Sequence, residues 1–243
     1  TFWPAWLAYA LVTGTVATGC WVIAHECGHN AFSDNRATQD AIGYALHSLL
    51  LVPYFSWQRS HAVHHSRTNH LTEGETHVPY VKGDAKGTLN LNLHNTIGEG
   101  PFAALQLVAH LAFGWPAYLL TGATGGSARG VTNHFVPNVN TGPVELFPGS
   151  WKRKVWISDI GVVGVVAGLT FWACNAGLPT VAALYFGIHL SQVTRSLNDE
   201  TLYLPMKLPF DPALWPLYVR KRLACSLHMA SAHRHRCTPP CII

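Results

Sequence analysis

Five histidines stand in two groups whose spacing suits metal binding. The histidine pair is His25 and His29, in WVIAHECGHNAF, and the histidine triplet is His61, His64 and His65, in SHAVHHSRTNH. On a helix, residues three or four positions apart lie on one face, so each group would present its imidazoles together. Neutral imidazole binds zinc, iron, copper and nickel. We therefore predict one metal site built from both groups.

The histidine pair alone also fits a different chemistry, because His25-Glu26-x-x-His29 is the H-E-x-x-H pattern of a zinc protease helix. In that alternative Glu26 is the general base and a distant residue completes the zinc ligands. A membrane zinc protease has no use for the histidine triplet, whereas a site with two irons needs nitrogen donors from several segments. A structural zinc site would favour cysteine, but Cys27 lies on another face of the helix. The triplet thus favours a two-iron site.

The elements that must position these histidines are predicted to be membrane helices. Of the 243 residues, 49% are hydrophobic and only 12% are charged, about half the charged share of an average soluble domain. Nine tryptophans and eight tyrosines fit aromatic anchors at a membrane interface. The net charge of +4 does not suggest nucleic acid and fits basic loops facing the cytosol. The six scattered cysteines do not form a secreted disulfide framework.

Apolar runs give the predicted order of these helices. The runs are residues 5–24, 41–57, 101–123 and 155–190. The first is uncharged, ends at His25 and is long enough to cross a bilayer core of about 30 Å. The last is broken by the turn signal NAGLP, and residues 58–100 read as a polar loop region. We predict an all-α helical membrane bundle with the histidines in a cap on its cytosolic side.

The basic segment WKRK, residues 151–154, lies just before a predicted span and is therefore expected on the cytosolic side. If the two histidine groups share a metal, both lie on one side of the membrane. The 41–57 run should then dip in and return, or lie in the interface. Because the histidine triplet and residues 151–154 are both expected on the cytosolic side, the 101–123 run between them should also return to that side. This run contains Gly114 and Pro116. The alternative is a simple crossing by each run.

Two segments resemble known motifs. HECGHNAFSD and SHAVHHSRTNHLTEGETHVP look like the first and second histidine boxes of membrane fatty acid desaturases. The likeness is strongest to the endoplasmic-reticulum Δ12 (omega-6) desaturases of plants and algae, with the omega-3 enzymes close behind. LLVPYFSWQRSH, FGWPAYL, TNHFVPN and LFPGSWKRKVWISDIG also match that family. The resemblance runs from about residue 3 to about residue 190.

The resemblance implies an integral membrane enzyme of the endoplasmic reticulum with its histidine boxes facing the cytosol. It implies two irons, with His25 and His29 as ligands from the first box and His61, His64 and His65 as ligands from the second. O₂ and electrons from NADH, delivered through cytochrome b5 and its reductase, would introduce a cis double bond into a lipid acyl chain. Δ12 or omega-3 regiospecificity stays open, as does a hydroxylase or acetylenase outcome.

The resemblance ends near residue 190. The family has a third box, H-x-x-H-H, and no such motif follows His65; the histidines of the tail, His228, His233 and His235, are spaced differently. We therefore expect residues 1–190 to be a partial desaturase domain and residues 191–243 to be a divergent tail. A third reading is a non-catalytic, truncated membrane protein.

Ligand counting gives the same expectation. Two irons held mainly by imidazole need on the order of eight nitrogen donors, and the two boxes supply five. We therefore expect this chain alone to bind at most one metal tightly and to desaturate nothing.

Other histidines are interpreted more simply. His47, between the two groups, is expected either to pack against a polar partner or to support a ligand. His70 and His77 are expected to lie in a solvent-exposed loop. His134, in TNHF, matches the family but has no role that the sequence assigns.

Overall fold

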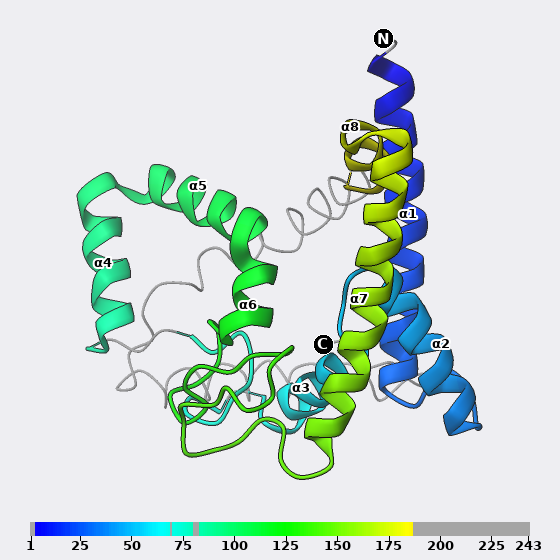
Figure 1. Cartoon of the computed structure of the whole chain (residues 1–243). Coiled ribbons are helices and arrows are strands. Elements are labelled where there is room, and N and C mark those ends of the chain that lie inside the picture. The colour runs from blue at the N-terminus through cyan, green and yellow to red at the C-terminus, as the bar shows by residue number, and fades with distance from the viewer. Residues whose placement is uncertain (1–2, 69, 80–82, 187–243) are drawn as a thin grey trace, which may run out of the picture. The chain divides into compact units, whose positions relative to one another are not determined.

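The computed structural model describes residues 3–68, 70–79 and 83–186. Helices and connecting loops make up these residues, and their only β-structure is an isolated bridge between Thr132 and Asn140. The predicted all-α class is confirmed. The predicted tail, residues 191–243, and the end of the last apolar run lie outside the described residues. The helices, drawn in Figure 1, are α1 (Trp3–Gly28), α2 (Arg36–Leu49), α3 (Tyr54–Ser66), α4 (Ala85–Ile97), α5 (Glu99–Ala109), η1 (His110–Gly114), α6 (Trp115–Thr121), α7 (Trp151–Ala176), α8 (Leu178–Val181) and η2 (Ala182–Phe186).

The chain divides into two compact units. Among the described residues, the larger unit includes 3–78 and 99–186, and so holds both histidine groups. The smaller unit contains α4. Residues 58–100 are thus not a continuous polar loop, because α3 extends to Ser66 and α4 forms within the stretch.

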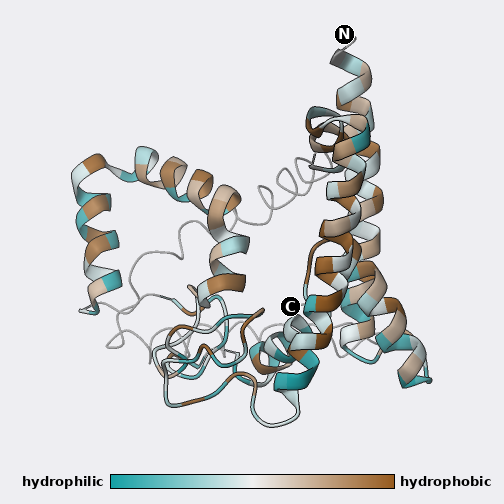
Figure 2. Ribbon diagram, viewed as in Figure 1, coloured by the Kyte–Doolittle hydropathy of each residue, from teal (hydrophilic) through white to brown (hydrophobic). Residues whose placement is uncertain are grey.

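Three helical stretches are long and apolar enough to cross a membrane: Pro4–Gly28, Glu99–Thr121 and Trp151–Ala176. Hydrophobic colours predominate along α1 and α7 in Figure 2. Large apolar side chains on these helices are open to the surroundings, including Val16 (61% exposed), Ile160 (70%) and Phe171 (73%). Side chains of this kind suit a lipid environment. The fold is that of a helical membrane bundle.

The 41–57 run does not cross as one helix. Asn35 caps α2 by accepting hydrogen bonds from the backbone of Ala37 and Thr38, and α2 turns back along α1 (Figure 1). α2 ends at Leu49, and a short connection with Leu51 in the left-handed region (φ 58°) leads into α3. The run is thus divided between two helices, and that it does not make a single crossing stays a prediction.

The 101–123 run is helical throughout, although it contains Gly114 and Pro116. Glu99–Thr121 is one uninterrupted helical stretch, with a π-helical turn at His110–Gly114. Pro116 lies in the first turn of α6, where a missing backbone N–H is best tolerated. At Gly114 a side chain would stand 3.2 Å from the His110 ring, so glycine leaves room for that ring. The run holds no internal break, but it ends beside the loop after α3, where the N–H of Val78 donates to the carbonyl of Thr124 at 3.0 Å. Its return to the cytosolic side stays a prediction.

α7 fixes the positions of α2 and α3. The hydroxyl of Tyr44 on α2 donates to the carbonyl of Ile157 at 2.9 Å. The backbone N–H of Phe55 at the start of α3 donates to Ser158 Oγ at 2.8 Å. At Gly161, a side chain would collide with Tyr44 and Ser48, so α2 and α7 approach closely there. A small core of Val63, Leu146, Phe147 and Val155 packs the other side of α3.

Candidate metal centre

The end of α1 meets α3 at a cluster of imidazoles. His29 Nε2 lies 3.3 Å from His25 Nε2 and 3.0 Å from His61 Nε2. His65 Nε2 lies 3.0 Å from His61 Nε2. The ligand atoms of His25, His29 and His61 all lie within 4.8 Å of one another. Four of the five predicted ligands are thus together.

His64 lies at the edge of this cluster. Its ring centroid is 5.5 Å from that of His65 and 6.0 Å from that of His61. On the other side it is 6.0 Å from the ring of His77. His70 and His77 are both exposed, as expected for a loop, but no spacing or motif pairs His77 with His64.

Three of the five histidines, His29, His61 and His64, are held in the neutral form that a metal requires. Burial is the main cause that lowers the pKa of His29, of His64 and of His61, the last to about 2. Neighbouring imidazoles lower these pKa values further. Neutral rings keep a free lone pair, which is the form that binds a metal.

Glu26 orients His25. Its Oε1 accepts a hydrogen bond from His25 Nδ1 at 3.0 Å. The proton is then on Nδ1, and the unprotonated Nε2 faces His29. Carboxylates commonly fix metal-binding histidines in this way.

The donor set fits a transition metal. Two nitrogens at right angles around a metal, each about 2.0–2.1 Å from it, are about 2.9 Å apart. The Nε2 separations of 3.0 to 3.3 Å in the cluster are close to this value. Cys27 is fully buried and is not in the group of ligand atoms found among the described residues. An all-nitrogen donor set of this kind suits iron or zinc. It does not resemble a structural zinc site, because such sites favour thiolate ligands.

Trp57 supports the cluster and was not singled out from the sequence. Its ring stacks on His61 with centroids 4.5 Å apart and planes 18° apart, and it lies 5.4 Å from the His25 ring. Trp57 is 3% exposed. The available signal was its position four residues before His61, which places both on one face of α3.

His47 lies behind Trp57 rather than among the ligand nitrogens. Its ring centroid is 4.8 Å from that of Trp57, and its side chain is fully buried. Burial lowers the pKa of His47 to about 3. Neither ring nitrogen has a hydrogen-bond partner among the described residues, so the expected polar partner is not found there.

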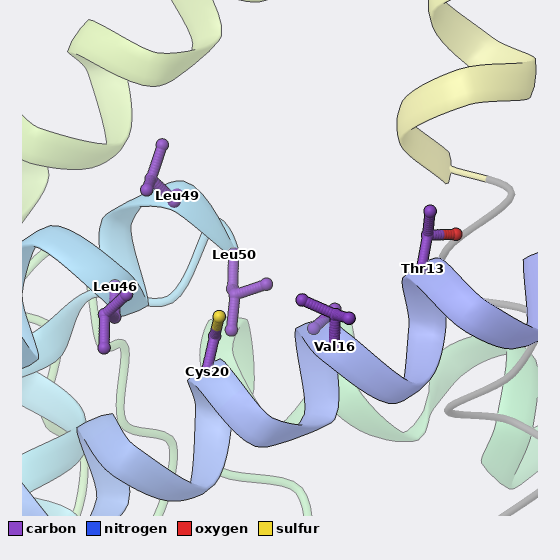
Figure 3. Close-up of a pocket in the computed structure, with 7 residues that line it drawn as sticks. Thr13, Val16, Cys20, Leu46, Leu49 and Leu50 are labelled. Carbon is purple, nitrogen blue, oxygen red and sulfur yellow. The ribbon is translucent and has the colours of Figure 1, made fainter.

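An apolar cavity of about 290 Å³ lies between α1 and α2. Figure 3 shows Cys20 and Val16 of α1 on the side that faces Leu50, the residue that follows α2. The remaining lining residues are Thr13, Ala17, Leu46 and Leu49. This lining suits a hydrocarbon chain. Cys20 precedes His25 by five positions, which is about 7.5 Å along a helix.

Comparisons with known proteins agree with these features. The sequence profile described as "Fatty acid desaturase" matches residues 1–197. A Delta(12) fatty acid desaturase of Calendula officinalis is 40% identical over 183 residues, covering 75% of this chain and 45% of the relative. A Delta(12)-fatty-acid desaturase of Arabidopsis thaliana is 38% identical over 181 residues, covering 74% and 45%. A Delta(12)-acyl-lipid-desaturase of Punica granatum is 37% identical over 217 residues, covering 88% and 53%.

The chain therefore spans about half the length of the curated relatives that it matches. No solved structure matches it.

Proposed function

The chain belongs to the fatty acid desaturase family, and from that premise we propose that it carries part of an iron centre that desaturates a lipid acyl chain. The double bond would be introduced at the Δ12 or the omega-3 position. The observation that supports this most is the convergence of the Nε2 atoms of His25, His29, His61 and His65 from α1 and α3.

The overall reaction balances with O₂ as oxidant and NADH as reductant. The acyl –CH₂–CH₂– unit loses two hydrogens, NADH and a proton supply two electrons and two more hydrogens, and O₂ becomes two molecules of water. When bound, the irons supply the oxidant that an unactivated C–H bond requires. Cytochrome b5 and its reductase would carry the electrons from NADH.

The protein's own residues bind and orient. His25, His29, His61, His64 and His65 would hold iron, with Glu26 keeping His25 in the required tautomer. Trp57 covers one face of His61 and keeps water from it. The apolar cavity beside α1 would hold part of the acyl chain.

The five imidazoles do not complete a two-iron site, which needs on the order of eight nitrogen donors. The remaining donors would come from outside the described residues, and this chain alone would bind at most one metal tightly. We also propose that residues 1–190 form the family domain and residues 191–243 a divergent tail.

Location follows from the same proposal. The protein would lie in the endoplasmic reticulum membrane with the histidines facing the cytosol. The basic residues Lys152, Arg153 and Lys154 at the start of α7 are the sequence feature that favours this orientation. Its partners would be the lipid substrate, cytochrome b5 and the reductase, with no nucleic acid.

Metal identity tests the proposal. The full chain, purified in detergent, is loaded with iron or zinc and its bound metal is measured together with that of His61→Ala. We expect iron to bind and to be lost in His61→Ala. Zinc binding that survives His61→Ala, with peptide cleavage that Glu26→Gln abolishes, would overturn the proposal in favour of a zinc protease.

Activity is assayed with oleate, NADH, cytochrome b5 and its reductase. We expect no linoleate from this chain alone. Two tightly bound irons together with linoleate would contradict the incomplete site while supporting the desaturase.

A further inference from the structure

Four polar side chains are buried together beside α3, away from the imidazole cluster. They are Ser60, Glu75, Tyr118 and His134, here called the buried tetrad. Ser60 and His134 are fully buried, Glu75 is 2% exposed and Tyr118 is 8% exposed. They come from α3, the loop after it, α6 and the loop after α6. None of them has a role in the proposed metal site.

The buried tetrad forms a series of contacts, in which the link between Glu75 and His134 is longer than a hydrogen bond. Ser60 Oγ lies 2.6 Å from the Tyr118 hydroxyl. That hydroxyl donates to Glu75 Oε2 at 3.4 Å. Glu75 Oε1 lies 3.8 Å from His134 Nε2. At the far end, His134 Nδ1 lies 3.2 Å from the carbonyl oxygen of Leu119.

Counting donors and acceptors fixes the protonation of this series. The Leu119 carbonyl only accepts, so His134 carries its proton on Nδ1 and its Nε2 is an acceptor. An ionised Glu75 would also present only acceptors, and Oε1 and Nε2 would then face each other without a proton. Neither atom has a hydrogen bond to any other described residue. A protonated Glu75 removes this repulsion, with the two atoms 3.8 Å apart and thus in contact without a hydrogen bond. At the other end, Ser60 Oγ also lies 3.0 Å from the carbonyl of Trp57, to which it can donate.

The charges around Glu75 allow that protonation. Arg129 is the charged group that faces it and favours the carboxylate, but burial outweighs this effect and raises the pKa of Glu75 to about 8. Arg129 is itself bound to the backbone carbonyls of Glu73 and Glu145. Burial also lowers the pKa of His134 to about 4, so its ring is neutral.

The buried tetrad ends on the helix that carries the histidine triplet. Ser60 immediately precedes His61 on α3. The other end is fixed by the backbone, because the N–H of His134 donates to the carbonyl of Leu119 at 2.8 Å. A rotation of α3 about its axis would break the 2.6 Å contact of Ser60 and would turn His61 away from His29.

We infer that the buried tetrad, with Glu75 protonated, fixes the rotation of α3 and thereby aims His61 at the histidine pair. Ser60, Glu75, Tyr118 and His134 are positioning residues, since none of them touches the imidazole cluster's ligand nitrogens. The inference rests on the proposed function only in taking His61 to be a metal ligand.

The test uses the full chain in lipid nanodiscs with Co²⁺ as the metal probe. Tyr118→Phe and Glu75→Leu break the series, whereas Glu75→Gln keeps a neutral group that both donates and accepts. We expect Tyr118→Phe and Glu75→Leu to weaken Co²⁺ binding at least tenfold and to alter its visible absorption. Glu75→Gln should stay within about threefold of the wild type.

The matched control is Tyr44→Phe, which also removes a tyrosine hydroxyl bonded to another helix, but joins α2 to α7 and leaves α3 alone. Its Co²⁺ affinity should be that of the wild type. Equal losses in Tyr44→Phe and Tyr118→Phe would overturn the inference by indicating general destabilisation. So would equal losses in Glu75→Gln and Glu75→Leu.

A second measurement needs no metal. Hydrogen exchange of the backbone amides of α3 should become faster in Tyr118→Phe and stay unchanged in Tyr44→Phe. Unchanged exchange of α3 in Tyr118→Phe would overturn the inference. A wild-type chain that binds no metal, together with faster exchange of α3 in Tyr118→Phe, would count against the proposed function while supporting the buried tetrad.

Discussion

Nε2 of His29, at the end of α1, lies 3.0 Å from Nε2 of His61 on α3, although 32 positions separate them in the chain. Two lone pairs at that distance repel each other unless a proton or a metal lies between them. The low pKa of both rings keeps them neutral, so one ring can donate from Nε2 to the other and a metal would replace that single proton. This contact therefore decides where a metal would bind.

The first prediction concerns that contact. His61→Ala should lower iron bound to the purified chain at least tenfold, because His61 is the ring adjacent to both His29 and His65. His70→Ala is the matched control, since His70 is exposed and its Nδ1 accepts from the backbone of Glu73. Metal analysis measures both, and equal iron in the two variants would contradict the assignment.

The second prediction concerns the tautomer of His25. Glu26→Leu should lower metal affinity about 10- to 100-fold, as is usual when a carboxylate that orients a ligand is removed. Glu26→Gln keeps an oxygen that accepts from His25 Nδ1 and should lose less. Titration with Co²⁺ gives both affinities. Equal losses in the two variants would mean that the charge of Glu26 matters and its hydrogen bond does not.

The third prediction concerns pH. Glu75 has a raised pKa in the folded chain, about 8 against an ordinary 4.5, so the stability given by its proton is present below pH 4.5 and is lost as the pH rises through 8. The histidines with lowered pKa act oppositely, but only below about pH 6.5. Between pH 6.5 and 8 the melting temperature should therefore fall.

The control for this effect is Glu75→Gln, which has no titrating group at that position. Its melting temperature, followed by tryptophan fluorescence in nanodiscs, should be flat between pH 6.5 and 8. A parallel decline in the wild type and in Glu75→Gln would assign the effect to another group.

The fourth prediction compares two glycines of α7. A side chain at Gly161 would collide with Tyr44 and Ser48, whereas one at Gly164 would meet nothing within 4 Å. Gly161→Ala should destabilise the bundle by about 1–3 kcal/mol through overpacking. Gly164→Ala should stabilise the helix by about 0.5–1 kcal/mol. Melting temperatures check both, and a stabilising Gly161→Ala would show that α2 and α7 do not approach closely.

Local patterns predicted much of this arrangement. The uncharged run before His25 predicted α1, and i, i+3 and i+4 spacing predicted which imidazoles share a helix face. The requirement that both histidine groups meet predicted that residues 41–57 do not cross the membrane as a single helix. Each of these inferences uses residues close together in the chain or a single geometric constraint.

Contacts between distant segments were not predictable in this way. Glu75 and His134 are 59 positions apart, and neither spacing nor hydropathy indicates that they meet. The helical course of the 101–123 run was also not predictable from its residues. Gly114 and Pro116 are ordinary signals of a break, but a π-helical turn accommodates both within a continuous helix.

α1 carries one wall of the apolar cavity and the histidine pair on a single helix, Trp3–Gly28. Its rise of about 1.5 Å per residue places Thr13 about 18 Å from His25 along the axis. No hinge separates them, so motion between helices leaves this distance unchanged. Inserting or deleting one residue between Cys20 and His25 would change the distance along α1 between the cavity-lining residues and the imidazoles. It would also rotate those residues about the helix axis by about 100° relative to the imidazoles.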